Sequence, residues 1–264
     1  MQKFSYKGVE IAYVDEGSGE ALLYIHEWNG SSQVFVRANL PILKRDFRVV
    51  AFDLPGFGKS GQIEGFVYGE IERLISALMD HLGLDQFHIM GFCLGSSMAL
   101  DYYLHNPKRI KSLILMDIAL TFPIIMRLMN LPIIGRLLYK IFSRTKSGFS
   151  AFLMFVNNRV LIGNADLFES IQQTTYANAR LYINSVRKEL ATFTKSVAEQ
   201  THHPPCLVIT SDNTLRLFYK DSHTMHRIWQ ESKLIVMKNC GHYIQLQKPK
   251  SLCEHVKSFI ESNA

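Results

Sequence analysis

The chain has 264 residues, of which 47% are hydrophobic, and this composition supports a large core and excludes an intrinsically disordered protein. Its formal net charge at pH 7 is +6. Because neither a long Lys/Arg block nor a nucleic-acid-binding motif accompanies this modest charge, we expect no nucleic-acid partner.

The four cysteines and the first residues bear on the cellular compartment. Cys93, Cys206, Cys240 and Cys253 are widely separated and form no Cys-x-x-Cys pair, so we expect free thiols and no bound metal. Residues 1–8 lack the apolar segment of a signal peptide, and no stretch is long and apolar enough to cross a bilayer. We therefore expect a soluble, cytoplasmic protein.

The N-terminal part of the chain alternates between short apolar runs and amphipathic segments. Residues 4–6 and 11–14 predict a β-hairpin, and residues 21–25 and 48–52 predict buried strands on either side of a helix at 34–43. A strand, a helix and a strand in this order indicate a parallel crossover connection.

The alternation continues through the middle of the chain. Residues 71–82 have the apolar spacing of an amphipathic helix, which ends at Gly83. An apolar run at 87–92 precedes a helix that extends to Asn106, and a further strand is predicted at 112–116. This pattern predicts an α/β protein with a doubly wound, mostly parallel sheet, whose active edge lies at the carboxyl ends of the strands.

The pattern changes after the strand at 112–116. Between residues 119 and 199 the segments are helix-like and none has a convincing strand pattern, so we predict an inserted helical cap over 119–199. The core then comprises residues 1–118 and 200–264. Core elements then resume in the order strand, helix, strand, helix. We place the strands at 205–210 and 233–237, the first helix between them as far as about Trp229, and the second helix from Pro249 onward.

A Gly-x-Cys-x-Gly turn follows the strand at 87–92. Gly91 and Gly95 flank Cys93 with the spacing of a nucleophile elbow, in which two residues without side chains let the backbone bend tightly. Cys93 would then be a nucleophile whose thiolate attacks an acyl carbon and forms a thioester. The alternative is that Cys93 is a small buried apolar side chain, as most free cysteines are.

A candidate base follows the last predicted strand, in the segment Cys240-Gly241-His242. Imidazole exchanges protons near neutral pH, so His242 is positioned to deprotonate Cys93 or to hold it as a thiolate–imidazolium pair. The alternative is a loop histidine with a satisfied hydrogen bond.

Four segments resemble, in chain order, the landmarks of the α/β-hydrolase fold superfamily: the oxyanion loop at 26–32, the following turn at 53–60, the elbow at 91–95 and the histidine loop at 240–242. The chain is identified as a member of the helical-cap type, with Cys in place of the usual Ser. Dienelactone hydrolases and polyhydroxyalkanoate synthases are similar in carrying Cys there. The resemblance implies an α/β-hydrolase fold and a catalytic triad that works without a cofactor.

The acid of the triad follows either of two strands in this superfamily. Ungapped alignment backward from His242 places Thr214 at the later of these positions, with Asp212 two residues away. Asp117 instead ends the strand after the elbow helix, in a setting that resembles members with the acid there. We predict Asp117 as the acid and Asp212 as the second choice, the alternative for either being a carboxylate that caps a loop or helix.

The resemblance also places the oxyanion hole at the backbone N–H groups of Trp28 and Leu94, directed to where negative charge develops. The usual His-Gly of the oxyanion loop is His26-Glu27 in this chain. A bulky acid therefore stands at a position that normally allows unusual backbone geometry. Either the oxyanion hole has a different geometry in this chain, or the reaction is not ordinary hydrolysis.

The predicted cap is rich in Met and aromatic side chains, which we expect to form mostly its own core. Their surplus over the cleft favours an apolar acyl or ring substrate, with Phe92, Phe122 and Met126 as binding residues. A second interpretation, a weak contact of the cap with a membrane surface, rests on the neighbouring basic residues Arg127, Arg136 and Lys140.

Three functions follow from these motifs. The first is a hydrolase that cleaves an ester, thioester or lactone of a hydrophobic acid through Cys93, His242 and Asp117 and a covalent acyl-enzyme. The second is an acyltransferase on the same triad, because a thioester passes its acyl group to an amine or thiol when water is excluded. The third is a non-catalytic homologue that binds a small molecule. Two departures from the usual motif are consistent with it: Cys93 stands in place of Ser, and Glu27 stands in the oxyanion loop.

Overall fold

The computed structural model describes the whole chain except residues 67, 122–127, 157, 201–202, 230 and 264. Within the described residues eight strands form one sheet in the order β1-β2-β4-β3-β5-β6-β7-β8. The strands are β1 (Gln2–Tyr6), β2 (Val9–Glu16), β3 (Ala21–Ile25), β4 (Arg48–Phe52), β5 (Phe87–Phe92), β6 (Ile110–Met116), β7 (Cys206–Ser211) and β8 (Lys233–Met237).

The sheet is mostly parallel, as the alternation of strands and helices predicts. β1 pairs with β2 and β2 with β4 in antiparallel register, whereas every pair from β4 to β8 is parallel. The predicted hairpin closes at Lys7 and Gly8, whose φ values of 51° and 77° are those of a two-residue turn that matches the strand twist. The predicted doubly wound α/β fold is confirmed.

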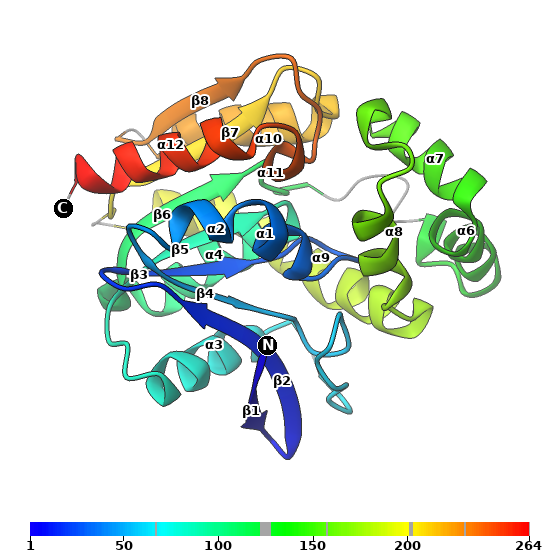
Figure 1. Cartoon of the computed structure of the whole chain (residues 1–264), viewed down its shortest axis with the longest axis horizontal. Helices are drawn as coiled ribbons and strands as arrows, with labels where there is room; N and C mark the ends of the chain where they lie inside the picture. The colour runs from blue at the N-terminus through cyan, green and yellow to red at the C-terminus, as the bar shows by residue number, and fades with distance from the viewer. Residues whose placement is uncertain (67, 122–127, 157, 201–202, 230, 264) are drawn as a thin grey trace.

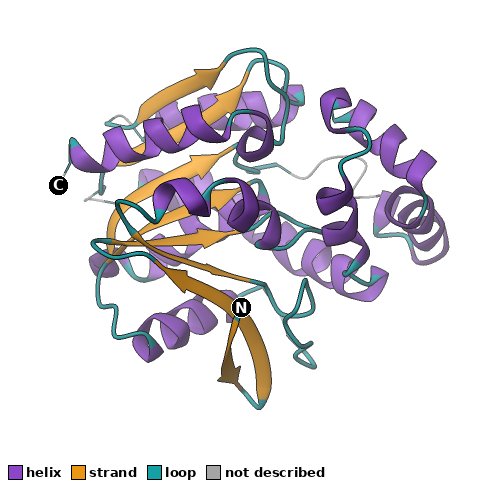
Figure 2. Cartoon of the chain, in the orientation of Figure 1, coloured by secondary structure: helices purple, strands orange, loops and turns teal. Residues whose placement is uncertain are grey.

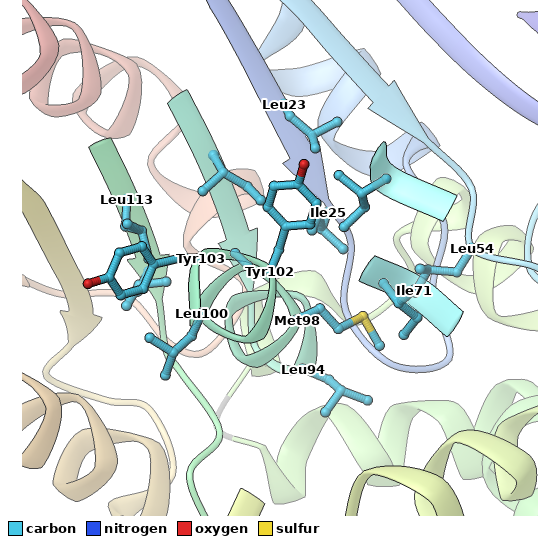
Figure 3. Close-up of a cluster of buried hydrophobic side chains, with 14 of the residues drawn as sticks. Leu23, Ile25, Leu54, Ile71, Leu94, Met98, Leu100, Tyr102, Tyr103 and Leu113 are labelled. Atoms are coloured by element: carbon cyan, nitrogen blue, oxygen red, sulfur yellow. The ribbon is translucent and has the colours of Figure 1, made fainter. Parts of the chain in front are cut away.

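Helices cover both faces of the sheet (Figure 2). Successive strand residues point to opposite faces, so Leu23 and Tyr24 of β3 belong to two different buried apolar clusters. Figure 3 shows part of the first cluster, in which Met98 and Tyr102 of the helix after β5 pack with the strands. The core helices are α1 (Gln33–Ala38), α2 (Leu40–Leu43), α3 (Glu70–His81), α4 (Leu94–His105), η1 (Pro107–Arg109), α10 (Arg216–Ile228), α11 (Ile244–Gln247) and α12 (Pro249–Glu261).

A group of helices lies between β6 and β7 in the chain: α6 (Pro132–Arg144), α7 (Lys146–Phe155), η2 (Arg159–Leu161), α8 (Ala165–Gln172) and α9 (Tyr176–Ala198), here called the inserted helices. Side chains of Thr145, Asn164 and Thr175 accept hydrogen bonds from the first turns of α7, α8 and α9, which fixes where these helices begin.

The described part of residues 119–199 contains no strand, and Figure 1 shows α6, α7 and α8 beyond the carboxyl ends of the parallel strands. The division into a core and a cap domain stays a prediction. No helix among the described residues has both the length and the apolar character that a bilayer crossing requires.

Candidate active site

The turn after β5 has the tight geometry that the glycine spacing predicts. Cys93 has φ 54° and ψ −114°, a backbone conformation that L-residues other than glycine rarely adopt. A Cβ on Gly91 would lie 2.3 Å from the carbonyl oxygen of Gly95, and a Cβ on Gly95 would lie 2.2 Å from that of Ile25. Both glycines are therefore required for the close approach of β5, α4 and β3, which holds Cys93 at the apex of the turn.

A buried carboxylate and His242 meet at the same edge of the sheet. Asp117 directly follows β6 and accepts hydrogen bonds from His242 Nδ1 (2.9 Å), Thr210 Oγ1 (2.7 Å) and Thr214 Oγ1 (2.7 Å). A carboxylate can only accept, so Nδ1 of His242 carries its hydrogen in this contact. The ring is thereby oriented with Nε2 left to accept a proton.

The two candidate acids of the sequence analysis occupy different settings. Asp212 is exposed and accepts a hydrogen bond from the backbone N–H of Asn239, which joins the loop after β7 to the loop after β8. Asp117 is fully buried and is the carboxylate in contact with His242. Thr214, which the alignment placed at the later position, contributes a hydroxyl to Asp117 instead of an acid.

Two aromatic rings hold the imidazole of His242 in place. Phe218 of α10 stacks on it at a centroid distance of 4.4 Å and an interplanar angle of 11°, and Phe92 contacts it at 4.7 Å. Phe92 is fully buried and is not among the residues that line the described cavity, so its role in substrate binding stays a prediction. Sequence reasoning missed Phe218, because nothing in its local pattern marks it.

A cavity of about 170 Å³ lies between the core and the inserted helices. Cys93 and His242 both line it, and most of its other described walls are apolar: Trp28, Met129, Phe142, Phe152, Phe155, Val156, Ile171, Leu215, Phe218 and Tyr243. Such a lining suits an apolar ligand with a polar reacting group. Phe122 and Met126, expected to bind substrate, lie outside the described residues.

The thiol of Cys93 is protonated in this arrangement. Burial raises its pKa strongly, and the nearby carboxyl groups of Glu27, Asp117 and Asp221 add to the rise, while a hydrogen bond from the Leu94 N–H opposes it. No hydrogen bond joins Cys93 to His242 among the described residues. Of the two alternatives considered for this pair, the raised pKa favours a neutral thiol that His242 deprotonates over a preformed thiolate–imidazolium pair.

The oxyanion loop is fixed by its first residue. The backbone N–H of Leu54 donates to His26 Nε2 (3.0 Å), so Nδ1 carries the hydrogen and donates to the Glu27 carbonyl (2.7 Å). Burial lowers the pKa of His26, which keeps this neutral tautomer. Asp53 adds a second brace by accepting from both the N–H and the hydroxyl of Ser32.

The α9 helix is fastened to the loops around the cavity. The indole N–H of Trp28 donates to the carbonyl of Ala179 (2.9 Å), and Asn178 Nδ2 donates to the carbonyl of Gly56 (2.8 Å). The hydroxyl of Tyr182 donates to the carbonyl of Pro55 (3.1 Å). The oxyanion loop and the turn after β4 are therefore both attached to one inserted helix.

Glu27 places an unpartnered acid in the cavity wall. The residue is 3% exposed, and its carboxyl oxygens have no hydrogen-bond partner among the described side chains. Burial raises its pKa to about 8, so the carboxyl is neutral at pH 7. A Cβ on Gly30 would lie 2.4 Å from Glu27 Oε1, so Gly30 is what makes room for the acid. The left-handed position of the loop is taken by Asn29, with φ 60°, and not by Glu27.

Residues 20–249 match the family model described as the alpha/beta hydrolase fold. The chain belongs to the alpha/beta hydrolase fold family.

Curated relatives of this alpha/beta hydrolase differ in what their names say they do. A "2-hydroxy-6-oxononadienedioate/2-hydroxy-6-oxononatrienedioate hydrolase 1" of Dechloromonas aromatica (strain RCB) is 26% identical over 96% of this chain and 91% of its own length. A "Dihydrolipoyllysine-residue acetyltransferase component of acetoin cleaving system" of Cupriavidus necator is 30% identical over 42% of this chain. Matches at 30–36% identity span only 30–39% of those relatives.

Solved structures share the fold over nearly the whole chain. A thermophilic esterase from Thermogutta terrifontis superposes with a TM-score of 0.80 at 20% identity, covering 100% of this chain and 99% of that one. At this level of identity the likeness establishes the fold alone.

Proposed function

We propose that this chain is a hydrolase that cleaves an ester, thioester or lactone of a hydrophobic acid, with Cys93 as nucleophile, His242 as general base and Asp117 as the acid that orients it. The observation that carries the proposal is the buried contact between Asp117 and His242 beside the strained turn that presents Cys93 to the same cavity. Family membership and the hydrolases among its relatives support the reaction class.

The first half-reaction forms a thioester. Because the thiol is neutral, His242 Nε2 must take its proton as Sγ attacks the carbonyl carbon, and Asp117 stabilises the resulting imidazolium. The carbonyl π electrons move to the oxygen, and the N–H groups of Leu94 and Trp28 are the proposed donors to it. Collapse breaks the bond to the leaving group, which takes the proton from His242.

The second half-reaction regenerates the thiol. Water replaces the leaving group, His242 takes a proton from it, and hydroxide adds to the thioester carbon. Collapse of this second intermediate breaks the C–S bond, and the sulfur recovers the proton from His242. The free acid then leaves the apolar cavity.

Glu27 has a place in this scheme as a neutral hydrogen-bond donor. Its unpartnered carboxyl lies in the same cavity wall as Cys93, and its raised pKa keeps the proton on it at pH 7. We propose that the Glu27 carboxyl donates a hydrogen bond to a polar atom of the substrate next to the scissile bond. A buried donor without a partner costs free energy, which a substrate oxygen would recover on binding.

An acyltransferase is the second candidate. The apolar, buried setting of Cys93 disfavours water at the thioester, and one partial relative is named as an acetyltransferase component. An amine or thiol acceptor would then replace water in the second half-reaction.

The test is a panel of p-nitrophenyl esters with acyl chains of two to twelve carbons, with and without a thiol acceptor. We expect burst release of p-nitrophenol from the wild-type protein, and intact mass spectrometry should find an acyl adduct that Cys93→Ala lacks. Faster turnover with acceptor, and an acylated acceptor as product, would favour the transferase. Neither turnover nor a Cys93-dependent adduct with any ester would favour the non-catalytic binder.

A further inference from the structure

The α6 helix is oriented with its aliphatic side chains outward. Toward the other inserted helices it buries Gly135, Tyr139 and Ser143, one residue per turn. Its opposite face exposes large branched side chains: Ile133 (84% exposed), Ile134 (51%), Leu137 (59%) and Ile141 (42%). This is the reverse of the usual arrangement of a surface helix, whose apolar face covers a core.

The exposed aliphatic face of α6 belongs to a larger surface. Among the described residues, every exposed large apolar side chain except Met1 falls between residues 128 and 162. We call these residues the apolar patch: Leu128, Leu131, Ile133, Ile134, Leu137, Ile141, Met154, Phe155, Val160 and Ile162. From the sequence we expected the Met and aromatic side chains of this segment to form mostly a cap core, whereas Met154 and Phe155 are exposed. Helix α6 contacts α7, and α7 contacts η2, so most of these side chains lie on adjoining elements. Exposed apolar side chains gathered in this way indicate an interaction surface.

The charge of the protein is concentrated in the same segment. Residues 118–165 contain six Lys or Arg residues and no Asp or Glu, whereas the whole chain has 29 basic and 23 acidic residues. The rest of the chain is therefore balanced, and this segment accounts for the entire formal net charge of +6. Within the described part of the chain, Arg136, Lys140, Lys146 and Arg159 are exposed and form no ion pair.

Cations and apolar groups adjoin each other in a shallow groove along α6. The groove has a volume of about 550 Å³ and is lined by Pro132, Ile133, Arg136, Leu137, Lys140, Tyr176 and Arg180. Arg136 and Lys140 lie one turn apart on the helix. A phosphate group and the start of an acyl chain would find a charged and an apolar contact there at the same time.

We propose that the apolar patch and its basic residues bind the surface of an anionic phospholipid bilayer. A helix with apolar side chains on one side and Lys and Arg beside them lies in the interface, with the apolar groups in the acyl boundary and the cations at the phosphates. Figure 1 shows α6 and α7 at one edge of the molecule, on the right of the view.

The docking surface is continuous with the cavity. Phe155 belongs to the apolar patch, is 54% exposed and also lines the cavity that contains Cys93 and His242. A bound bilayer would therefore lie against one wall of the cavity. Membrane binding does not depend on the proposed function, but the delivery of an acyl substrate from the lipid phase rests on it.

Cosedimentation of the full chain with vesicles tests the docking. We expect the wild-type protein to sediment with vesicles of phosphatidylcholine containing about one third phosphatidylglycerol, and much less with phosphatidylcholine alone. Each surface cation is worth about 1 kcal/mol, roughly fivefold, so Arg136→Glu/Lys140→Glu should weaken binding at least tenfold. Lys238→Glu/Lys250→Glu changes the net charge equally at exposed sites outside the segment and should change binding less than twofold.

A second variant tests the apolar contribution. Ile133→Ser/Leu137→Ser alters only exposed side chains, so circular dichroism should be unchanged while vesicle binding falls at least tenfold. Absence of wild-type sedimentation, or equal losses in the two charge variants, would overturn the proposal. Concentration-dependent dimerisation that Ile133→Ser/Leu137→Ser abolishes, without vesicle binding, would assign the patch to a second copy. Hydrolysis of a soluble short ester, measured separately, reports on the proposed function alone.

Discussion

The two walls of the cavity are built in opposite ways. The wall at the carboxyl edge of the sheet is held by specific contacts: Asp117 accepts three side-chain hydrogen bonds, and His242 contacts the rings of Phe92 and Phe218. The wall from the inserted helices is almost entirely apolar, and its outer side exposes aliphatic groups to solvent. In the proposed reaction, the residues at the sheet edge attack the scissile bond, and the inserted helices select the acyl group that binds.

Removal of the Cys93 sulfur at the sheet edge should have the largest effect on activity and is the strongest test of this difference between the two walls. Cys93→Ala should lower kcat/KM for p-nitrophenyl butyrate by a factor of about 10³ or more, because the covalent step is lost. Cys253→Ala, at another buried thiol outside the cavity, should retain activity within about threefold. Equal activity of the two variants would contradict a role for Cys93 in the chemistry.

The next largest effect should come from the acid. Asp117→Asn keeps the shape of the side chain but removes the charge that stabilises the imidazolium, so we expect kcat to fall by a factor of about 10² to 10⁴. Asp212→Asn is the matched control and should change kcat less than about twofold. The steady-state rates of the two purified variants decide between the two candidate acids.

The buried acid of the oxyanion loop should make stability depend on pH. Its pKa is about 8 in the folded chain and 4.5 when unperturbed, so burying Glu27 favours its protonated form. Stability from this group is fully present below the unfolded value and is lost as pH rises toward 8, by an amount on the order of 4 kcal/mol. Urea unfolding should find Glu27→Gln close to wild type at pH 5 and several kcal/mol more stable at pH 9. If the difference in free energy of unfolding between the wild type and Glu27→Gln does not change with pH, Glu27 is charged in the folded protein.

The smallest expected effect sharpens the role of the insertion in substrate choice. Phe155→Ala removes part of an apolar cavity wall, so KM for p-nitrophenyl octanoate should rise about tenfold while that for the acetate stays constant. Val160→Ala, which shortens another member of the apolar patch that does not line the cavity, should leave both KM values unchanged. Parallel changes for both esters would argue against acyl recognition by this wall.

The sequence predicts the sheet edge well because its signals are local. The glycines around Cys93 and the apolar run before them specify a strand and a tight turn, and topology then brings Asp117 and His242 to the same edge. Thr210 was not foreseen, although β6 and β7 pair Met116 with Ile209, so the next residues, Asp117 and Thr210, are adjacent. The adjacency of Asp117 and Thr210 depends on how β6 and β7 are aligned, so the sequence of either strand alone does not reveal it.

The orientation of the inserted helices could not be predicted in the same way. The α6 helix has apolar residues on more than one side, so its periodicity indicates a helix without indicating which face is buried. The stripe of Gly135, Tyr139 and Ser143 marks the buried face only once the hydrogen bond from Tyr139 to Asn29 is known. The protonation of Cys93 was equally hidden, because it depends on burial and on Glu27, which approaches through the fold.

The attachment of α9 has a mechanical consequence. Its first two turns are hydrogen-bonded to the loops bearing Trp28, Pro55 and Gly56, so the helix and these loops are held together. If α9 tilts to admit a bulky molecule, it must either rupture these ties or pull the tryptophan loop along. A displacement of α9 that keeps the Trp28 contact would therefore also move a residue whose backbone N–H is a proposed oxyanion donor.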